Sequence, residues 1–129
     1  MFKKDLLKDK RILITGGGTG LGKEMANHFA EHGAELYICG RRNNVLAETA
    51  NEIIDKYKTQ VHTQVLDIRA SKDVDDYVQS IFDDKPLDGL INNAAGNFIS
   101  PTEMLSQNAF KAVIDIVLMG TWNLSLIHI

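Results

Sequence analysis

Five glycines lie within the seven residues from Gly16 to Gly22, directly after the apolar run Arg11–Thr15. An ordinary turn between a strand and a helix uses one or two glycines, so this density predicts a loop whose backbone turns sharply and comes close to another group. From Gly20 to His32 the apolar residues change to helical spacing. A strand, a glycine-rich turn and a helix in this order bring free backbone N–H groups and the positive end of a helix dipole together, where a pyrophosphate can bind.

Strand-like and helix-like segments alternate along the sequence. Short apolar runs predict strands at Arg11–Thr15, Glu35–Cys39, Gln60–Leu66 and Leu87–Asn92. Stretches with apolar residues at helical spacing follow them, over residues 20–32, 46–57, 71–81 and 110–118. This alternation favours parallel strands joined by right-handed crossovers. We therefore expect an α/β fold: a Rossmann-type, doubly wound parallel sheet, truncated after the fourth strand and the helix that follows it.

Some details of the helices can also be predicted. Leu21, Met25 and Phe29 fall on one face of the first helix, with Ala26 and Ala30 beside them, and we expect that face to be buried. Ser71 is placed to cap the third helix, and Ser106 to cap the last one.

Composition excludes several classes of protein. The 129 residues are 44% hydrophobic and 24% charged, close to globular averages. A formal net charge of −3 argues against a nucleic-acid-binding protein. One cysteine excludes an internal disulfide, and the four histidines do not cluster, so no metal site is predicted. We find no membrane-spanning run and no signal peptide, and we expect a cytoplasmic protein.

The glycine-rich loop has the spacing Thr-Gly-x-x-x-Gly-x-Gly over Thr15–Gly22, which resembles the short-chain dehydrogenase/reductase family. Three later features resemble the same family: Asp67 after the third strand, the segment Asn92–Gly96 (Asn-Asn-Ala-Ala-Gly) after the fourth, and the apolar helix that follows. The resemblance covers about residues 7–123. It implies an oxidoreductase that binds a nicotinamide dinucleotide.

The end of the second strand indicates which nicotinamide cofactor is used. A carboxylate there binds the adenosine ribose and selects NAD, whereas an arginine accommodates the 2′-phosphate of NADP. Here Gly40 stands at the acidic position, and Arg41 and Arg42 follow it. We therefore predict NADP(H), with Arg41 as the main contact and Arg42 as a secondary one. The alternative is a solvated basic pair at the start of a helix, where cations oppose the helix dipole.

The resemblance implies a full set of cofactor-binding residues. Asp67 would accept a hydrogen bond from the adenine amino group, or else cap a helix. Asn92–Gly96 would line the nicotinamide side, or else serve as turn residues. The predicted set is Thr15, Gly16, Gly18, Thr19, Gly20, Leu21, Gly22, Arg41, Arg42, Asp67, Ile68, Asn93, Ala94, Ala95 and Gly96.

The stretch from Asn92 to Thr102 resembles the 2,4-dienoyl-CoA reductases within this family, and Val117 stands where many other members have an asparagine of a proton relay. The resemblance implies hydride transfer from NADPH to a 2,4-dienoyl-CoA thioester in fatty-acid β-oxidation, leaving a 3-enoyl-CoA. Phe98 and Ser106 would then contact the acyl-CoA, and Asn97 would help to hold its thioester carbonyl. Phe98 as a core residue and Ser106 as a helix cap are the alternatives.

No catalytic residue can be assigned. Family members are about twice as long, and their Tyr-x-x-x-Lys pair belongs to the other half; none of the three tyrosines here has a lysine four residues later. We therefore expect this chain alone to be inactive. The resemblance also implies that the full-length protein is a homotetramer. Two other functions stay open, namely a reductase of 3-oxoacyl thioesters or other carbonyls, and an NADP(H) sensor without chemistry.

The last six residues, Leu124–Ile129, match a translation of a transposase end sequence used in DNA library preparation. We hypothesise that residues 1–123 are the cofactor-binding half and that residues 124–129 are an artefact. The alternative is an apolar helix that continues naturally. A sheet ending at its fourth strand would leave that strand and apolar helix faces exposed, so we also expect the product to aggregate readily.

Overall fold

The computed structural model describes residues 2–126 and confirms the predicted α/β class. The strands are parallel and lie in the order β3-β2-β1-β4. Their bounds are β1 Arg11–Thr15, β2 Glu35–Gly40, β3 Val61–Val65 and β4 Gly89–Ile91. The helices are α1 Gly20–Glu31, α2 Asn43–Tyr57, α3 Ser71–Phe82, the 3₁₀ turn η1 Thr102–Met104, α4 Gln107–Ile114, the π-helical segment η2 Asp115–Met119 and α5 Gly120–Ser125.

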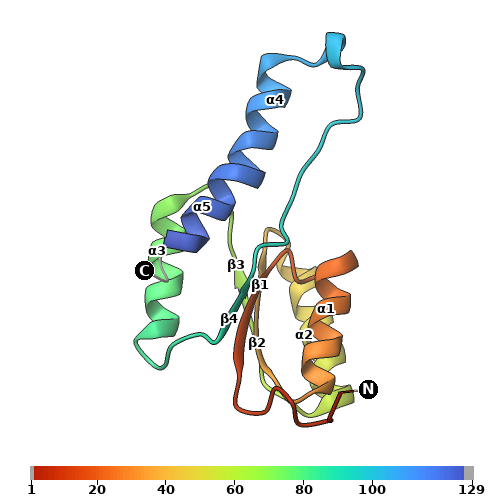
Figure 1. The fold of residues 1–129 in the computed structure, drawn as a ribbon, viewed down its shortest axis with the longest axis vertical. Coiled ribbons are helices and arrows are strands. Elements are labelled where there is room, and N and C mark those ends of the chain that lie inside the picture. The colour runs from red at the N-terminus through yellow and green to blue at the C-terminus, as the bar shows by residue number, and fades with distance from the viewer. Residues whose placement is uncertain (1, 127–129) are drawn as a thin grey trace.

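Helices cover both faces of the sheet, with α1 and α2 on one side and α3 and α5 on the other (Figure 1). Alternate residues of β1 and β2 point to opposite faces and so build two separate cores. Ile12, Ile14, Leu36 and Ile38 pack against α1 and α2, whereas Leu13, Tyr37 and Cys39 pack with α3 and with Leu124 of α5. β1 and β2 therefore have nearly continuous apolar sequences, because both of their faces are buried.

Two predictions about the helices are wrong. Leu21 is 71% exposed, because the face of α1 against the sheet consists of the small residues Gly22, Ala26 and Ala30, one position further along the chain. Small residues let the helix lie close to the sheet, so the larger apolar side chains flank the contact. Ser71 does not cap α3; the cap position is Ala70, and no side chain bonds to the free amides there.

The helical segments α4, η2 and α5 form one long helix that projects from the sheet, and the connection from β4 runs out to its tip (Figure 1). Within the described residues, β4 pairs only with β1. The projecting part carries the exposed apolar side chains Phe98, Ile99, Met104, Phe110, Val117, Leu118, Met119 and Trp122. Leu124 is fully buried, whereas residues 127–129 of the proposed artefact lie outside the described residues.

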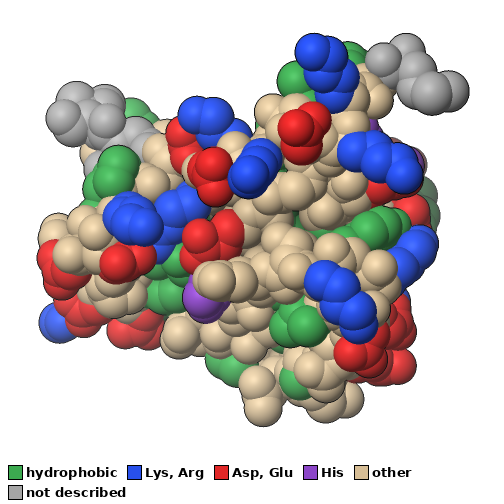
Figure 2. Space-filling model, turned by 90° about the horizontal axis from the view of Figure 1, so that it is seen from below, with side chains coloured by type: hydrophobic (Ala, Val, Ile, Leu, Met, Phe, Trp, Pro, Cys, Tyr) green, Lys and Arg blue, Asp and Glu red, His purple; other side chains and the backbone are tan. Residues whose placement is uncertain are grey.

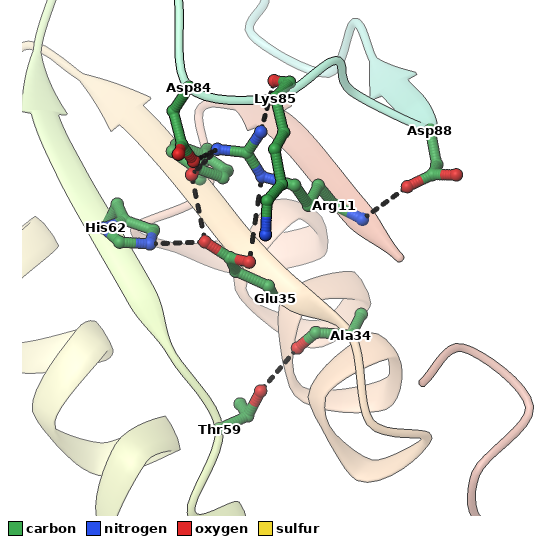
Figure 3. Close-up of polar contacts among 9 residues, drawn as sticks. Arg11, Ala34, Glu35, Thr59, His62, Asp84, Lys85 and Asp88 are labelled. Atoms are coloured by element: carbon green, nitrogen blue, oxygen red, sulfur yellow. Dashed lines mark hydrogen bonds and ion pairs between the residues drawn. The ribbon is translucent and has the colours of Figure 1, made fainter. Parts of the chain in front are cut away.

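Arg11, at the start of β1, is only 5% exposed and lies among polar groups from several elements (Figure 3). Its guanidinium donates to the Lys85 carbonyl, to the Tyr37 hydroxyl and to Asp84 Oδ2, the last at 3.0 Å. Its Nε lies 3.7 Å from Glu35 Oε2. These partners tie the α3–β4 connection to β1 and β2.

Figure 2 shows the molecule from the end at which the strands begin, where basic and acidic side chains are interspersed.

Candidate nucleotide-binding site

A cavity of about 510 Å³ lies at the carboxyl ends of the strands, where open α/β sheets bind ligands. The glycine-rich loop, the start of α2, the segment after β3 and the segment after β4 surround it. Its lining residues are Gly16, Gly18, Thr19, Cys39, Gly40, Arg41, Arg42, Val45, Leu46, Leu66, Asp67, Ile68, Arg69, Asn93, Ala94, Ala95 and Ile116.

The glycine-rich loop has the geometry that its sequence predicts. Gly16 and Gly20 have φ values of +68° and +52°, a region that other residues rarely adopt. A Cβ on Gly22 would lie 2.3 Å from the Gly16 carbonyl oxygen, so α1 begins in close contact with the loop. No side chain among residues 2–126 caps the N-terminus of α1, so the amides that begin the helix have no side-chain partner and can face an anion.

Thr15 joins the glycine-rich loop to the segment after β4. Its hydroxyl accepts hydrogen bonds from the backbone amides of Asn93 (3.0 Å) and Ala94 (2.9 Å), and it donates to the Ile91 carbonyl at 3.4 Å. The Asn93 side-chain amide in turn donates to the carbonyls of Thr15 (3.0 Å) and Gly16 (3.3 Å). Thr15 is only 1% exposed, so this side chain holds the two loops together from behind the cavity.

A second tether comes from helix α2. The buried hydroxyl of Thr49 donates to the Gly18 carbonyl at 2.8 Å, and the Gly16 amide donates to the Cys39 carbonyl at 2.8 Å. Burial raises the pKa of the Cys39 thiol to about 12, so this side chain stays protonated. The loop is thus fixed to β2 and α2 as well as to β4.

Charge in the cavity is concentrated in three arginines and one aspartate. Arg41 and Arg42 make no ion pair and no side-chain hydrogen bond with any residue between 2 and 126. Arg69 instead forms an ion pair with Asp67, and its hydrogen bonds hold the pKa of that carboxyl below its usual value. Two of the three cations are therefore available to a ligand.

Most of the predicted cofactor residues line this cavity: Gly16, Gly18, Thr19, Arg41, Arg42, Asp67, Ile68, Asn93, Ala94 and Ala95. The others, Thr15, Gly20, Leu21, Gly22 and Gly96, do not line it. Thr15 and Gly22 shape the loop from behind, and a Cβ on Gly96 would lie 2.8 Å from the side chain of Ile116.

Sequence reasoning missed Thr49, Arg69 and Ile116. Arg69 could have been found, since an aspartate in a turn commonly bonds to the backbone two residues later. Thr49 lies inside a helix and carries no local signal. Ile116 reaches the cavity from the π-helical segment η2, which the regular helical spacing does not predict.

None of the predicted substrate residues lines the cavity. Asn97 and Phe98 are exposed on the connection that runs from β4 to the tip of the long helix. Ser106 is the N-cap of α4, and its Oγ accepts from the Ala109 amide at 3.1 Å. The predicted capping role of Ser106 is therefore confirmed, while a contact with substrate stays a prediction for all three residues.

Residues 2–126 contain no group of His, Cys, Asp and Glu side chains that could hold a metal ion. No helix in that part of the chain is long and apolar enough to cross a membrane.

Comparison with known proteins defines the class to which this fold and site belong. Residues 10–128 match the family model of short chain dehydrogenases. The chain therefore belongs to the short-chain dehydrogenase family of oxidoreductases, as its glycine spacing predicts.

Two relatives show which members of the family the chain resembles. The chain is 43% identical over 117 residues to a "Probable 2,4-dienoyl-CoA reductase" of Bacillus subtilis (strain 168), covering 90% of this chain and 46% of the relative. It is 45% identical over 128 residues to "Probable 2,4-dienoyl-CoA reductase 3" of Caenorhabditis elegans, covering 97% of this chain and 41% of the relative. Their names specify a (2E)-enoyl-CoA and a (3E)-enoyl-CoA product respectively. The chain spans less than half the length of either one.

A solved structure shares the same fold. A short chain dehydrogenase of Escherichia coli CFT073, complexed with NADPH, is 29% identical and superposes with a TM-score of 0.91. The similarity covers 97% of this chain and 54% of that one.

Proposed function

We propose that the protein containing this chain is an NADPH-dependent reductase of 2,4-dienoyl-CoA thioesters, and that this chain supplies the nucleotide-binding half. The cofactor assignment rests on Arg41 and Arg42, which line the cavity and whose side chains make no ion pair and no hydrogen bond with any residue from 2 to 126. A planar guanidinium fork suits a phosphate monoester, such as the 2′-phosphate of NADP. The relatives named 2,4-dienoyl-CoA reductase and the NADPH complex of the E. coli protein support the proposal.

Each part of the cofactor would lie against a different segment around the cavity. The pyrophosphate would lie against the backbone of Gly16–Gly20, where a Cβ on Gly16 would come within 3.1 Å of the Asn93 side chain. The 2′-phosphate would lie at Arg41, with Arg42 beside it, and the adenine at Asp67 and Ile68. The nicotinamide would lie toward Asn93–Gly96, and when bound it supplies the hydride.

The substrate would approach along the connection after β4. We propose that Asn97, Phe98 and Ser106 contact the acyl-CoA in the complete protein, where residues outside this chain donate the proton. The chain alone would then bind nucleotide but catalyse nothing, and the complete protein would be a homotetramer active in fatty-acid β-oxidation.

The test uses the complete protein with NADPH or NADH, and with a 2,4-dienoyl-CoA or a 3-oxoacyl-CoA. We expect the absorbance of the reduced nicotinamide to fall fastest with NADPH and the dienoyl substrate, giving a 3-enoyl-CoA identified by proton NMR. Equal use of NADH would contradict the arginine argument. Faster reduction of the 3-oxoacyl thioester would indicate a carbonyl reductase, and tight NADPH binding without turnover would indicate a sensor.

A further inference from the structure

Helix α2 places one buried hydroxyl against the glycine-rich loop. Thr49 is 2% exposed, and its Oγ1 donates to the Gly18 carbonyl at 2.8 Å. A hydroxyl has one proton to donate, and a threonine inside a helix commonly gives it to a carbonyl of the preceding turn. Thr49 gives its proton to the loop instead, so this side chain joins two segments of the chain rather than bonding within its own helix.

The loop and α2 are in close contact at this point. Gly18 is buried, and a Cβ on it would lie 3.2 Å from Val45 Cγ1 and 3.3 Å from Leu46 Cδ2. The missing side chain lets the Gly18 carbonyl reach Thr49, but it also leaves the backbone around Gly18 with few steric limits on rotation. The hydrogen bond from Thr49 therefore supplies an orientation that the glycine itself does not.

This hydrogen bond fixes the direction of a whole peptide unit. None of the peptide bonds in residues 2–126 is cis, and in a trans peptide the C=O and the N–H point in opposite directions. Because the Gly18 carbonyl points to α2, the Thr19 N–H of the same unit points away from α2. That amide donates to no acceptor among residues 2–126, and both Gly18 and Thr19 line the cavity.

The direction of the Gly18–Thr19 peptide unit decides which partial charge the loop presents there. An N–H group carries a partial positive charge and stabilises an anion, whereas a carbonyl oxygen in the same place would repel it. Turning the unit over would break the bond to Thr49 and leave a buried hydroxyl without a partner, which is costly. The contact with α2 therefore opposes the orientation that is unfavourable for an anion.

We propose that Thr49 is a positioning residue, which holds the Gly18–Thr19 peptide unit with its N–H toward the cavity and so favours an anionic phosphate at the glycine-rich loop. Thr49 does not line the cavity and would touch no nucleotide itself. The inference rests on the proposed function, since it assumes that the anion is the pyrophosphate of a nicotinamide dinucleotide. The 2′-phosphate stays assigned to Arg41 and Arg42, so the two phosphate contacts can be tested separately.

The experiment compares two ligands that differ in the pyrophosphate. NADPH carries both the pyrophosphate and the 2′-phosphate, whereas adenosine 2′-phosphate carries only the latter. Their affinities for the complete protein are measured by calorimetry in the wild type and in Thr49→Val. We expect Thr49→Val to weaken NADPH binding about threefold to tenfold, the effect of one neutral hydrogen bond, and to leave the binding of adenosine 2′-phosphate unchanged.

Two further variants separate positioning from a general loosening of α2. Thr49→Ser keeps the hydroxyl, and it is expected to restore most of the NADPH affinity. Glu52→Gln breaks the ion pair that joins α2 to Lys23 of α1, but it leaves the bond between Thr49 and Gly18 in place. Glu52→Gln is therefore expected to change neither affinity.

A Thr49→Val variant that lost affinity for both ligands equally, or for neither, would overturn the proposal. Failure of Thr49→Ser to restore NADPH binding would overturn it as well. If Thr49→Val does not fold, Thr49→Ala, which also lacks the hydroxyl, decides by the same ratio of affinities. A wild type that binds neither NADPH nor NADH would refute the proposed function and this inference with it. NADPH binding that does not depend on the Thr49 hydroxyl would refute only the role of Thr49.

Discussion

The two ends of the same sheet use arginine in opposite ways. At the start of β1, Arg11 is buried and bonds to Tyr37, Asp84 and the Lys85 carbonyl (Figure 3). Beyond the end of β2, Arg41 and Arg42 are exposed in a cavity, and their side chains make no ion pair and no hydrogen bond with any residue between 2 and 126. An arginine whose partners come from its own fold contributes to stability, whereas an arginine left without partners beside a glycine-rich loop is available to a ligand. Substitutions at the two ends of the sheet should therefore affect different properties, stability at one end and ligand binding at the other.

The largest effect is expected from Arg11→Met. Removing the guanidinium takes the donor from the Lys85 carbonyl, one hydrogen bond from the Tyr37 hydroxyl, and the arginine charge that lies beside Glu35 and Asp84. We expect the free energy of unfolding to fall by about 3 kcal/mol, at the lower end for a broken buried pair because Asp84 is largely exposed. Chemical denaturation measures the loss. Affinity for NADPH, measured where the variant is folded, is expected to be unchanged; a large drop in affinity would break the contrast.

Arg41→Ala is expected to show the reverse. Losing a charged hydrogen bond to phosphate costs about 1.5–3 kcal/mol, so NADPH affinity should fall roughly tenfold to a hundredfold. NADH affinity and the melting temperature are expected to stay the same, because Arg41 makes no ion pair or side-chain hydrogen bond with any other described residue. Arg42→Ala is expected to show the same pattern with a smaller loss. A variant that lost NADH affinity equally would indicate that Arg41 does not contact the 2′-phosphate.

Two buried or partly buried threonines, one at each end of the sheet, allow a matched comparison. Thr49 donates to the Gly18 carbonyl at the cavity, and Thr59 donates to the Ala34 carbonyl at 2.6 Å near the start of β2 (Figure 3). Substitution by valine removes one hydrogen bond in each case, and we expect a loss of about 1 kcal/mol of stability from each variant. Only Thr49→Val is expected to weaken nucleotide binding, by a few-fold, because only Thr49 holds the glycine-rich loop. Equal affinities of the two variants would show that this tether is irrelevant to binding.

The smallest effect concerns acid stability. Burial alone would raise the pKa of Glu35, but hydrogen bonds from His62 and Tyr37 and the charge of Arg11 outweigh it, so its pKa is lowered from 4.5. A lowered pKa means that the stabilisation is present above pH 4.5 and is lost as the pH falls through the value in the folded protein. Over this range the free energy of unfolding is expected to fall further in the wild type than in Glu35→Gln, by less than about 1 kcal/mol. If the unfolding free energies of the wild type and Glu35→Gln fell in parallel with pH, this role of Glu35 would be contradicted.

The sequence predicts the order and type of the elements from β1 to α3 closely, because strand length, helical spacing and glycine placement are local properties. The sequence predicts the structure less well where tertiary contacts decide which side chains are buried. The buried face of α1 consists of Gly22, Ala26 and Ala30, because a helix that packs close to the sheet has room only for small side chains at the contact. Likewise, η2 changes the register of the long helix, so Ile116 reaches the cavity while Val117 and Leu118 are exposed.

In the candidate site too, local features are predictable from the sequence and long-range contacts are not. Residues within the glycine-rich loop and at the ends of β2 and β3 are predictable, because strand ends of a parallel sheet meet at one edge. The contact between Thr49 and Gly18 joins residues far apart in the sequence, and no periodicity indicates it.

The hydroxyl of Thr15 has one donor and two acceptor positions, and all three are used between the two loops that line the cavity. The backbone after β4 is therefore already held in place, because the Asn93 and Ala94 amides bond to Thr15. Little conformational entropy remains to be lost on association, so more of the contact energy is kept as affinity. A single buried oxygen thus makes the cavity a preorganised receptor.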